Sequence, residues 1–427
     1  MVSTPVASRS PRAWMRIAFA MFAVGWGANQ FSPMLIVYRH ELSLTAGEVA
    51  GLFLVYALTL IPGLLIGGPA SDRLGRRAVV WPFVALSPVA TLLLVLGPRS
   101  LAVIAVGRAL AGLCSGVVFG AATAWVQDVS PDEGPSNGLS VRRSALALTA
   151  GFGLGPVVAA GLAQWVSDPL VVPYLPHLVI GTAAAAVLAG TPEGAASRST
   201  ARIRPAGPLA TARRWPPAAV RTRQFWLEVA PGSPLVFGSV ALAIVVLPEE
   251  VTSAGTLSAG FAGLMTVISF AAGVAVQPLA RRLHDMLAGV VAGLVCAAAG
   301  CAVGIAAVAS ADRVLAGVAA VFLGLAYGLC LVSGLRQAEH MASPDERGAV
   351  IACYYAVAYL GFAVPYLAAG LGVLAGKSGA FAALTAIIAA LALWTAGYAA
   401  SLRRSSAGPE SDAIVRWSRR NRDSVSR

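Results

Sequence analysis

A short run of charged residues carries the most specific chemical pattern in this chain. It lies between two apolar stretches and reads Gly68-Pro69-Ala70-Ser71-Asp72-Arg73-Leu74-Gly75-Arg76-Arg77. A carboxylate and a guanidinium in such a run can form an ionic latch, and Asp128 is the expected further partner of Arg76. The residues assigned to this latch are Gly68, Asp72, Arg73, Gly75, Arg76, Arg77 and Asp128. The alternative is that these charges only anchor the loops beside a membrane.

Arg108 is the second chemically distinctive residue, because it lies inside an apolar run that continues to Gly112 and Gly116. A buried arginine is costly in lipid and usually faces the protein interior or a cavity. A purely structural arginine that bonds to backbone carbonyls is the alternative. The acids nearest the expected cavity are Glu228, Glu249 and Glu250, at the two ends of a later apolar run, and Glu249 and Glu250 are the candidates for carrying a proton.

A glycine-rich segment, Gly151-Phe152-Gly153-Leu154-Gly155-Pro156 followed by Gly161, lies within another apolar run. Glycines at these spacings leave one helix face bare, so a neighbouring helix can approach closely. Pro156 removes a backbone donor and predicts a bend. Ordinary helix packing uses the same spacing, so the Gly-Pro pair is the more specific part of the signal.

Residue patterns for enzymatic chemistry are not found. The five cysteines lie in apolar runs without metal-ligand spacing, and the four histidines are scattered near the ends of these runs. We therefore expect no metal, no cofactor and no enzymatic activity. The net charge of +12 is spread over short segments between apolar runs, which does not favour nucleic-acid binding.

The elements that position these residues are transmembrane helices. Hydrophobic residues make up 57% of the chain and charged residues 12%, and the mean hydropathy is +0.76. Apolar stretches of about 20 residues recur from end to end, each long enough to cross a hydrocarbon core. We predict about twelve helical spans: Ile17 to Tyr38, Val49 to Pro69, Ala78 to Gly97, Leu101 to Val126, Ala145 to Val166, Leu170 to Gly190, Val229 to Pro248, Leu257 to Leu279, Met286 to Ala309, Val314 to Leu335, Ala349 to Ala375 and Ala380 to Leu402.

Arginine placement predicts the orientation, because positive charge near span ends is retained in the cytoplasm. Every second connection is basic, for example at Arg73 to Arg77 and at Arg281 and Arg282. Both termini are therefore expected in the cytoplasm. The first apolar run shows no cleavage site and is read as an uncleaved span, which makes the protein a multi-pass protein of the cytoplasmic membrane.

The two halves of the chain repeat each other. Gly112 and Gly116 are echoed by Gly324 and Gly328, the sequence Ser-Pro-Asp-Glu follows both spans, and Pro156 matches Pro365. We expect a six-helix bundle over residues 1–190, a linker over 191–222, a second bundle over 223–402 and a basic tail over 403–427.

The run from Gly68 to Arg77 closely resembles the signature loop of the major facilitator superfamily. The resemblance implies that the latch holds the two bundles together on the cytoplasmic side in the outward-open state. The loop after the eighth span departs from the pattern, with Arg281 in place of the acid and His284 in place of the glycine, so a second latch is expected to be weaker or built differently.

The resemblance also assigns roles to three further groups of residues. Arg108 with its glycines resembles a motif tied to proton transfer, and Gly151, Gly155, Pro156 and Gly161 resemble a motif found mainly in drug-exporting antiporters. The family's cavity is lined by the first, fourth, seventh and tenth spans, with the eleventh adding to its wall. The cavity candidates are Trp26, Asn29, Gln30, Tyr327, Tyr355 and Tyr359. Interhelical hydrogen bonding and packing is the alternative role for these six.

Together these patterns predict an all-α secondary transporter that works by alternating access. The preferred interpretation is proton-coupled efflux of a small, largely apolar compound by a monomer in contact with membrane lipid. One alternative is proton-coupled or facilitative uptake of a metabolite. Another is a non-transporting membrane sensor or scaffold on the same fold.

Overall fold

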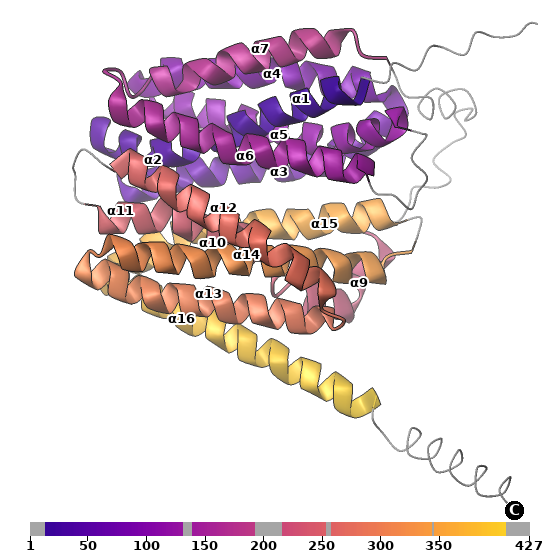
Figure 1. The fold of residues 1–427 in the computed structure, drawn as a ribbon, viewed down its shortest axis with the longest axis vertical. Coiled ribbons are helices and arrows are strands. Elements are labelled where there is room, and N and C mark those ends of the chain that lie inside the picture. Colours follow the sequence, from indigo (N-terminus) through magenta and orange to yellow (C-terminus); the bar gives the residue numbers. More distant parts are fainter. Residues whose placement is uncertain (1–12, 131–138, 193–215, 253–257, 344–345, 407–427) are drawn as a thin grey trace, which may run out of the picture.

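The structure is a computed structural model that describes residues 13–130, 139–192, 216–252, 258–343 and 346–406. Most of the predicted linker, the tail beyond residue 406, residues 131–133 of the first Ser-Pro-Asp-Glu repeat and residues 344–345 of the second lie outside the described residues. Figure 1 shows two groups of long helices side by side, one from the first half of the chain and one from the second.

The first bundle holds the helices up to residue 189. They are α1 (Ala13–Asn29), α2 (Phe31–Glu41), α3 (Ala46–Leu74), α4 (Arg76–Leu96), the 3₁₀ turn η1 (Gly97–Arg99), α5 (Leu101–Val129), α6 (Leu139–Trp165), the 3₁₀ turn η2 (Val172–Tyr174) and α7 (Leu175–Ala189).

The second bundle begins after the linker, and its first span contains two π-helical segments. Its elements are α9 (Ala218–Arg221), π-segment η3 (Phe225–Val229), α10 (Ser233–Ala241), π-segment η4 (Leu242–Val246), α11 (Leu247–Val251), α12 (Ser258–Arg282), α13 (Met286–Ser310), α14 (Arg313–Met341), α15 (Arg347–Tyr359), the 3₁₀ turn η5 (Leu360–Ala363) and α16 (Val364–Ser406).

Ten helical segments of the described chain are long and apolar enough to cross a membrane. Two features account for the difference from the predicted count of about twelve. The predicted first span is interrupted at Gln30, so neither α1 nor α2 reaches the length of a span. The segment Ala349–Arg404 has 56 residues and contains both predicted final spans, which are separated by a break at Gly376 with φ of 75°. The all-α membrane fold class is confirmed.

Local sequence signals explain where several helices begin. The Thr45 hydroxyl accepts a hydrogen bond from the Glu48 amide at 3.2 Å, and the Glu48 carboxylate accepts one from the Thr45 amide at 2.8 Å, which forms a capping box at α3. Asp285 and Asp312 accept hydrogen bonds from the first amides of α13 and α14.

The helices alternate between two ends of the molecule, which we name by their residues. The terminal end carries the start of α1, the end of α16, Gly75 and Arg282, and the far end carries Glu41, Trp165 and Gly376. Figure 1 shows the end of α16 on this terminal side, at the right.

The predicted internal repeat has a structural counterpart in the packing of two helix pairs. A Cβ at Gly112 or Gly116 would collide with the backbone of α3, at the carbonyls of Tyr56 and Leu60. A Cβ at Gly324 or Gly328 would collide in the same way with the backbone of α12. Glycine is therefore required at both places because two helix backbones touch.

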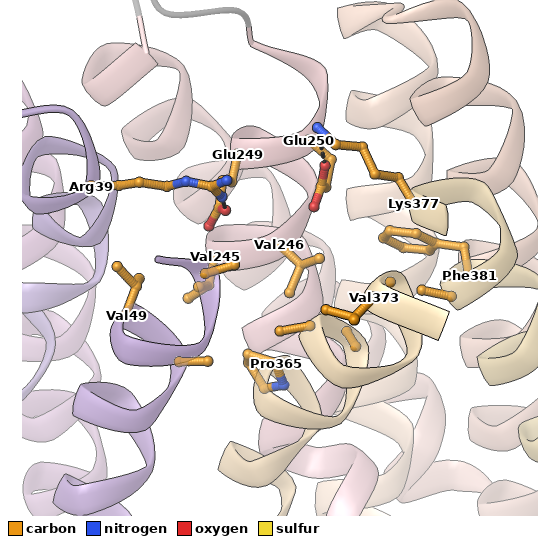
Figure 2. Close-up of a pocket in the computed structure, with 16 residues that line it drawn as sticks. Arg39, Val49, Val245, Val246, Glu249, Glu250, Pro365, Val373, Lys377 and Phe381 are labelled. Atoms are coloured by element: carbon orange, nitrogen blue, oxygen red, sulfur yellow. Dashed lines mark ion pairs between the residues drawn. The ribbon is translucent and has the colours of Figure 1, made fainter. Parts of the chain in front are cut away.

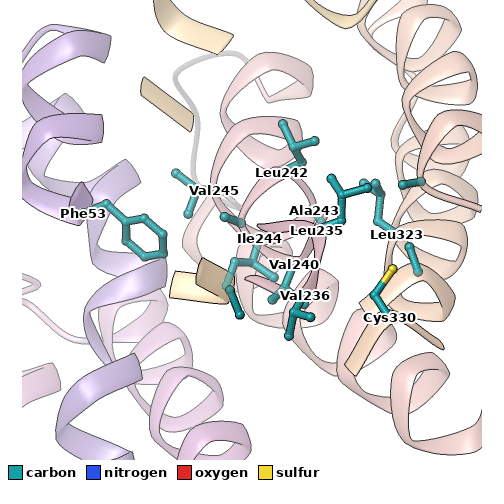
Figure 3. Packing of buried hydrophobic residues seen from close by; sticks show 14 of the residues in the cluster. Phe53, Leu235, Val236, Val240, Leu242, Ala243, Ile244, Val245, Leu323 and Cys330 are labelled. Atoms are coloured by element: carbon teal, nitrogen blue, oxygen red, sulfur yellow. The ribbon is translucent and has the colours of Figure 1, made fainter. Parts of the chain in front are cut away.

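One large cluster of buried apolar side chains extends across both bundles. Phe31, Phe53 and Tyr38 of the first bundle belong to it together with much of η4 and α14 in the second. Figure 3 shows Phe53 of α3 directed towards Ile244 and Val245 of η4, with Leu323 and Cys330 of α14 beyond them. The two bundles therefore share part of their core.

Candidate functional site

The predicted latch residues form an ionic cluster at the terminal end of the first bundle. The Arg76 guanidinium donates to Asp128 at 2.9 Å and to the Ser71 hydroxyl at 2.7 Å, and it pairs with Asp72 at 2.5 Å. Gly75, with φ of 100°, makes the turn that aims Arg76 back at these partners. The predicted partnership of Arg76 and Asp128 is thus present in the geometry. All four side chains belong to the first bundle in this structure.

The corresponding place in the second bundle is built differently. The Arg336 guanidinium of α14 donates to the backbone carbonyls of Ala280, Arg281 and Leu283 at 3.1–3.3 Å. These carbonyls terminate α12, so the arginine caps a helix C-terminus and needs no carboxylate there. This capping accounts physically for the altered loop sequence.

Arg108 is fully buried near the break between α1 and α2. Its guanidinium lies 4.1 Å from the ring centroid of Phe31 and 4.5 Å from that of Tyr56. It donates to the carbonyls of Ala28 and Leu52 at 3.4 Å. Two aromatic rings and two carbonyls surround the charge, which is the arrangement expected for a structural arginine. The proton-transfer role stays a prediction.

The polar residues at the α1 to α2 break face the interior of the first bundle. The Asn29 amide donates to the Phe152 carbonyl of α6 at 2.8 Å. The Gln30 amide donates to the Thr91 hydroxyl at 3.1 Å, and its own oxygen is buried without a hydrogen-bond partner among the described residues. Trp26 is 7% exposed, and its indole N–H likewise has no acceptor within the described chain. Asn29 and Gln30 therefore join helices here, whereas Trp26 keeps a polar group available.

A buried histidine extends this polar network, and the sequence analysis missed it. His177 of α7 contacts the Thr91 hydroxyl through Nδ1 at 2.7 Å and the Ser87 hydroxyl through Nε2 at 3.5 Å. Its ring also occupies the space that a Cβ at Gly27 would fill. The sequence placed this histidine only near the end of an apolar run. It did not show which face of the helix carries the side chain, and that face decides whether the ring is buried.

The glycines of the antiporter-like segment pack α6 directly on α1. A Cβ at Gly151 would collide with the Phe22 carbonyl, and a Cβ at Gly155 would lie 2.7 Å from the Trp26 carbonyl. Gly161 meets only Trp165 of its own helix, at 3.5 Å, and Pro156 lies inside the helix. Two of the three named glycines therefore place α6 against the part of α1 that holds Trp26.

Aromatic side chains of both bundles form a layer near the middle of the molecule. The rings of Phe237 and Tyr359 stack at 4.3 Å, and Phe362 contacts Phe53 at 4.7 Å and Tyr56 at 6.0 Å. Tyr355 lies 6.4 Å from Tyr359. Two predicted cavity residues, Tyr355 and Tyr359, thus belong to a surface shared by the two bundles.

Tyr327 of α14 is close enough to Tyr355 and Tyr359 for their hydroxyls to interact electrostatically. Its ring packs against Phe270 at 5.6 Å and over Gly273 of α12, within the second bundle. The six cavity candidates thus form two sets: the three tyrosines are near one another on α14 and α15, whereas Trp26, Asn29 and Gln30 lie at the α1 to α2 break of the first bundle.

Glu249 and Glu250 lie at the far end, on the rim of a pocket of about 190 Å³ between the bundles. Glu249 pairs with Arg39 of the first bundle, and Glu250 pairs with Lys377 at 2.7 Å within the second. Figure 2 shows both ion pairs above apolar side chains that include Val49, Val245 and Phe381. Glu249 therefore joins the two bundles, whereas Glu250 forms its ion pair within the second bundle.

Two polar contacts join the bundles at the far end. We call them the far-end seal: the Arg39–Glu249 pair and the hydrogen bond from the Gly260 amide to the Gln164 side chain at 3.1 Å. The first span meets the second bundle through α2, which packs against α12 and η4. The bundles are thus joined where residues 39, 164 and 249 lie.

Known proteins share both the sequence pattern and the fold. The profile of the Major Facilitator Superfamily matches residues 17–237. The quinolone resistance protein NorA of Staphylococcus aureus strain MRSA252 is 25% identical over 146 residues, which are 34% of this chain and 37% of NorA. The aligned part therefore spans little more than a third of that relative.

Three solved structures are similar in fold. A mutant of the nucleoside transporter NupG has a TM-score of 0.70 at 9% identity, and the match covers 90% of this chain and 99% of NupG. An inward-facing, occupied bacterial homologue of the human lysosomal transporter Spinster has a TM-score of 0.65 at 13% identity, covering 91% and 96%. A partially occluded, inward-open structure of XylE, the xylose transporter from E. coli, has 0.62 at 16% identity, covering 90% and 96%.

Proposed function

This chain belongs to the Major Facilitator Superfamily, and we propose that it is a transporter that exports a small, largely apolar compound by proton-coupled alternating access. The observation that carries the proposed direction is the packing of the antiporter-like segment. Gly151 and Gly155 hold α6 against the backbone of α1 next to Trp26. A drug-resistance relative, matched over a third of its length, supports the same direction.

The far-end seal supports an alternating-access cycle. With the termini in the cytoplasm, the far end faces outwards, and the Arg39–Glu249 pair joins the bundles there. In this proposal the arrangement of the bundles is an inward-facing state. In this state the Arg76 guanidinium bonds to Ser71, Asp72 and Asp128 of its own bundle. The latch would exchange some of these partners for the second bundle when the terminal end closes.

The shared aromatic layer supports a substrate with large apolar surface. Phe237, Tyr359 and Phe362 pack their rings together at the junction of the bundles, and Trp26 of α1 has an N–H without an acceptor among the described residues. Such a surface gains affinity from apolar burial and ring stacking, with a single polar contact to orient the compound.

Proton coupling is assigned to the far-end acids in this proposal, with Arg108 as a charge that stays fixed. Protonation of Glu249 would remove its attraction to Arg39 and loosen the seal, because the pair joins the two bundles. Glu250 pairs within its own bundle, so its protonation would not separate the bundles.

Transport into inverted membrane vesicles tests the proposal. An acid-inside gradient is imposed, and uptake is measured for a panel of fluorescent dyes and metabolites, before and after a protonophore collapses the gradient. We expect gradient-dependent accumulation of at least one largely apolar dye. The antiport hypothesis is refuted if no compound shows gradient-dependent movement. Gradient-driven exit of a metabolite would instead support uptake into the cell, and absence of all movement would favour a sensor or scaffold.

A further inference from the structure

One buried carboxylate takes no part in the features described so far. Glu228 lies in the π-segment η3 at the terminal end of the second bundle and is 4% exposed. Glu249 and Glu250 are less buried and pair with cations. Within the described chain, no ion pair is formed by Glu228. A buried carboxylate without a charged partner depends on hydrogen bonds from neutral groups.

Neutral groups from three places hold the Glu228 carboxylate. Its Oε2 accepts hydrogen bonds from the side-chain amide of Gln224 at 3.0 Å and from that of Gln337 on α14. Its Oε1 accepts one from the Tyr398 hydroxyl of α16 at 3.5 Å. The ionised carboxylate therefore fastens the first span of the second bundle to α14 and α16.

Most charged and titratable groups on the surrounding elements interact with residues other than Glu228. Arg336 caps α12, Arg403 pairs with Asp285 at 2.9 Å, and Glu339 acts on Tyr355. Arg221 and Arg223 are exposed. Of these, Arg223 acts electrostatically on the Tyr398 hydroxyl, as Glu228 does.

We propose that Glu228 is a proton-binding site of the carrier, and that its protonation releases the base of the seventh span from α14 and α16. Both groups that face Oε2 are amide N–H donors, which disfavours a proton on that oxygen. The Tyr398 hydroxyl can turn from donor to acceptor, so a proton from water binds at Oε1 and points at Tyr398. Tyr398 is half-buried beside the terminal end, which gives the proton a route to that side.

The inference deepens the proposed function, because it rests on a proton-coupled cycle and adds a second proton site, at the terminal end, to the far-end acids. It also identifies the moving element. The seventh span contains both π-segments, η3 at Glu228 and η4 just before Glu249 and Glu250. π-segments are local irregularities often found at functional sites, where a helix can shift its register.

A distance measurement tests the site without requiring transport. Spin labels are placed at Leu74→Cys and His284→Cys, exposed positions at the terminal end of the two bundles, in a background whose native cysteines are replaced by alanine. The inter-label distance is recorded in lipid nanodiscs across a pH series. We expect a pH-dependent shift in the wild type, its loss in Glu228→Gln, and wild-type behaviour in the matched control Glu339→Gln.

A second variant tests the same proposal if Glu228→Gln does not fold. Gln337→Met removes one donor to the ionised carboxylate at similar volume, which disfavours the charged form. The midpoint of the pH response should then rise by about one pH unit, since a hydrogen bond to a charged group is lost. The inference is overturned if Glu228→Gln keeps the wild-type response, if Gln337→Met leaves the midpoint in place, or if the wild type shows no response. An intact response together with no gradient-dependent transport would refute the proposed function alone.

Discussion

The packing of α6 on α1 gives a prediction that two neighbouring glycines can test against each other. A Cβ at Gly151 would collide with the Phe22 carbonyl and lie 2.9 Å from the Trp26 nitrogen, whereas a Cβ at Gly153 would meet nothing within 4 Å. Both substitutions to alanine occur in the same helix, two residues apart.

The expected difference in stability follows from one energy contribution that both variants share and one that only Gly151→Ala has. Alanine is favoured over glycine inside a helix by about 1 kcal/mol, and both variants gain this. Only Gly151→Ala adds overpacking against a backbone that cannot move aside, which costs about 1–3 kcal/mol. Gly153→Ala should therefore equal or exceed the wild type in stability, and Gly151→Ala should fall below Gly153→Ala by about 1–3 kcal/mol.

Unfolding in mixed micelles with increasing SDS measures this difference through the midpoint of each transition. Dye export by vesicles containing equal amounts of each variant gives the functional measurement, with slower transport expected for Gly151→Ala alone. Equal midpoints and equal transport for the two variants would refute the claim that close α6–α1 packing matters.

Three further outcomes follow from the ionic contacts. Arg76→Lys should slow transport at unchanged membrane insertion, because one ammonium cannot hold Ser71, Asp72 and Asp128 together, whereas Arg282→Lys should not; equal rates would contradict the latch. Glu249→Gln should raise the hydrogen-exchange rate at the far end of α2 several-fold, because it removes an ion pair worth about 1 kcal/mol, whereas Glu250→Gln should leave that rate unchanged. A larger increase for Glu250→Gln than for Glu249→Gln would show that the seal lies elsewhere. Arg108→Lys should lower the SDS midpoint, since about 1–2 kcal/mol of cation–π contact per ring is weakened; an unchanged midpoint would argue that the guanidinium contributes nothing by stacking.

Some features of the site were readable from residue type and spacing. The turn at Gly75, the pairing of Arg76 with Asp128 and the close contacts of Gly151 and Gly155 were expected from residue types and their placement along the spans. In each case the geometry needs a particular residue: a glycine where backbones touch, or opposite charges at the same end of two helices.

Other features could not be read in this way. Gln30 and His177 share Thr91, and Glu228 is the deeply buried acid, although the sequence pattern favoured Glu249 and Glu250. These outcomes depend on the rotation of each helix about its own axis. A span that is apolar on every face carries little information about that rotation.

By itself, the sequence determined that the chain crosses a membrane many times and that its halves repeat short motifs, because hydropathy and repeat are properties of local residue order. Only the tertiary structure decided that Arg39 and Glu249 join the bundles, that Arg108 lies between two rings, and that Glu228 is held by neutral donors. The physical reason is that lipid and protein interior are equally apolar, so contacts between helices, and not hydropathy, set which face of each span points inwards.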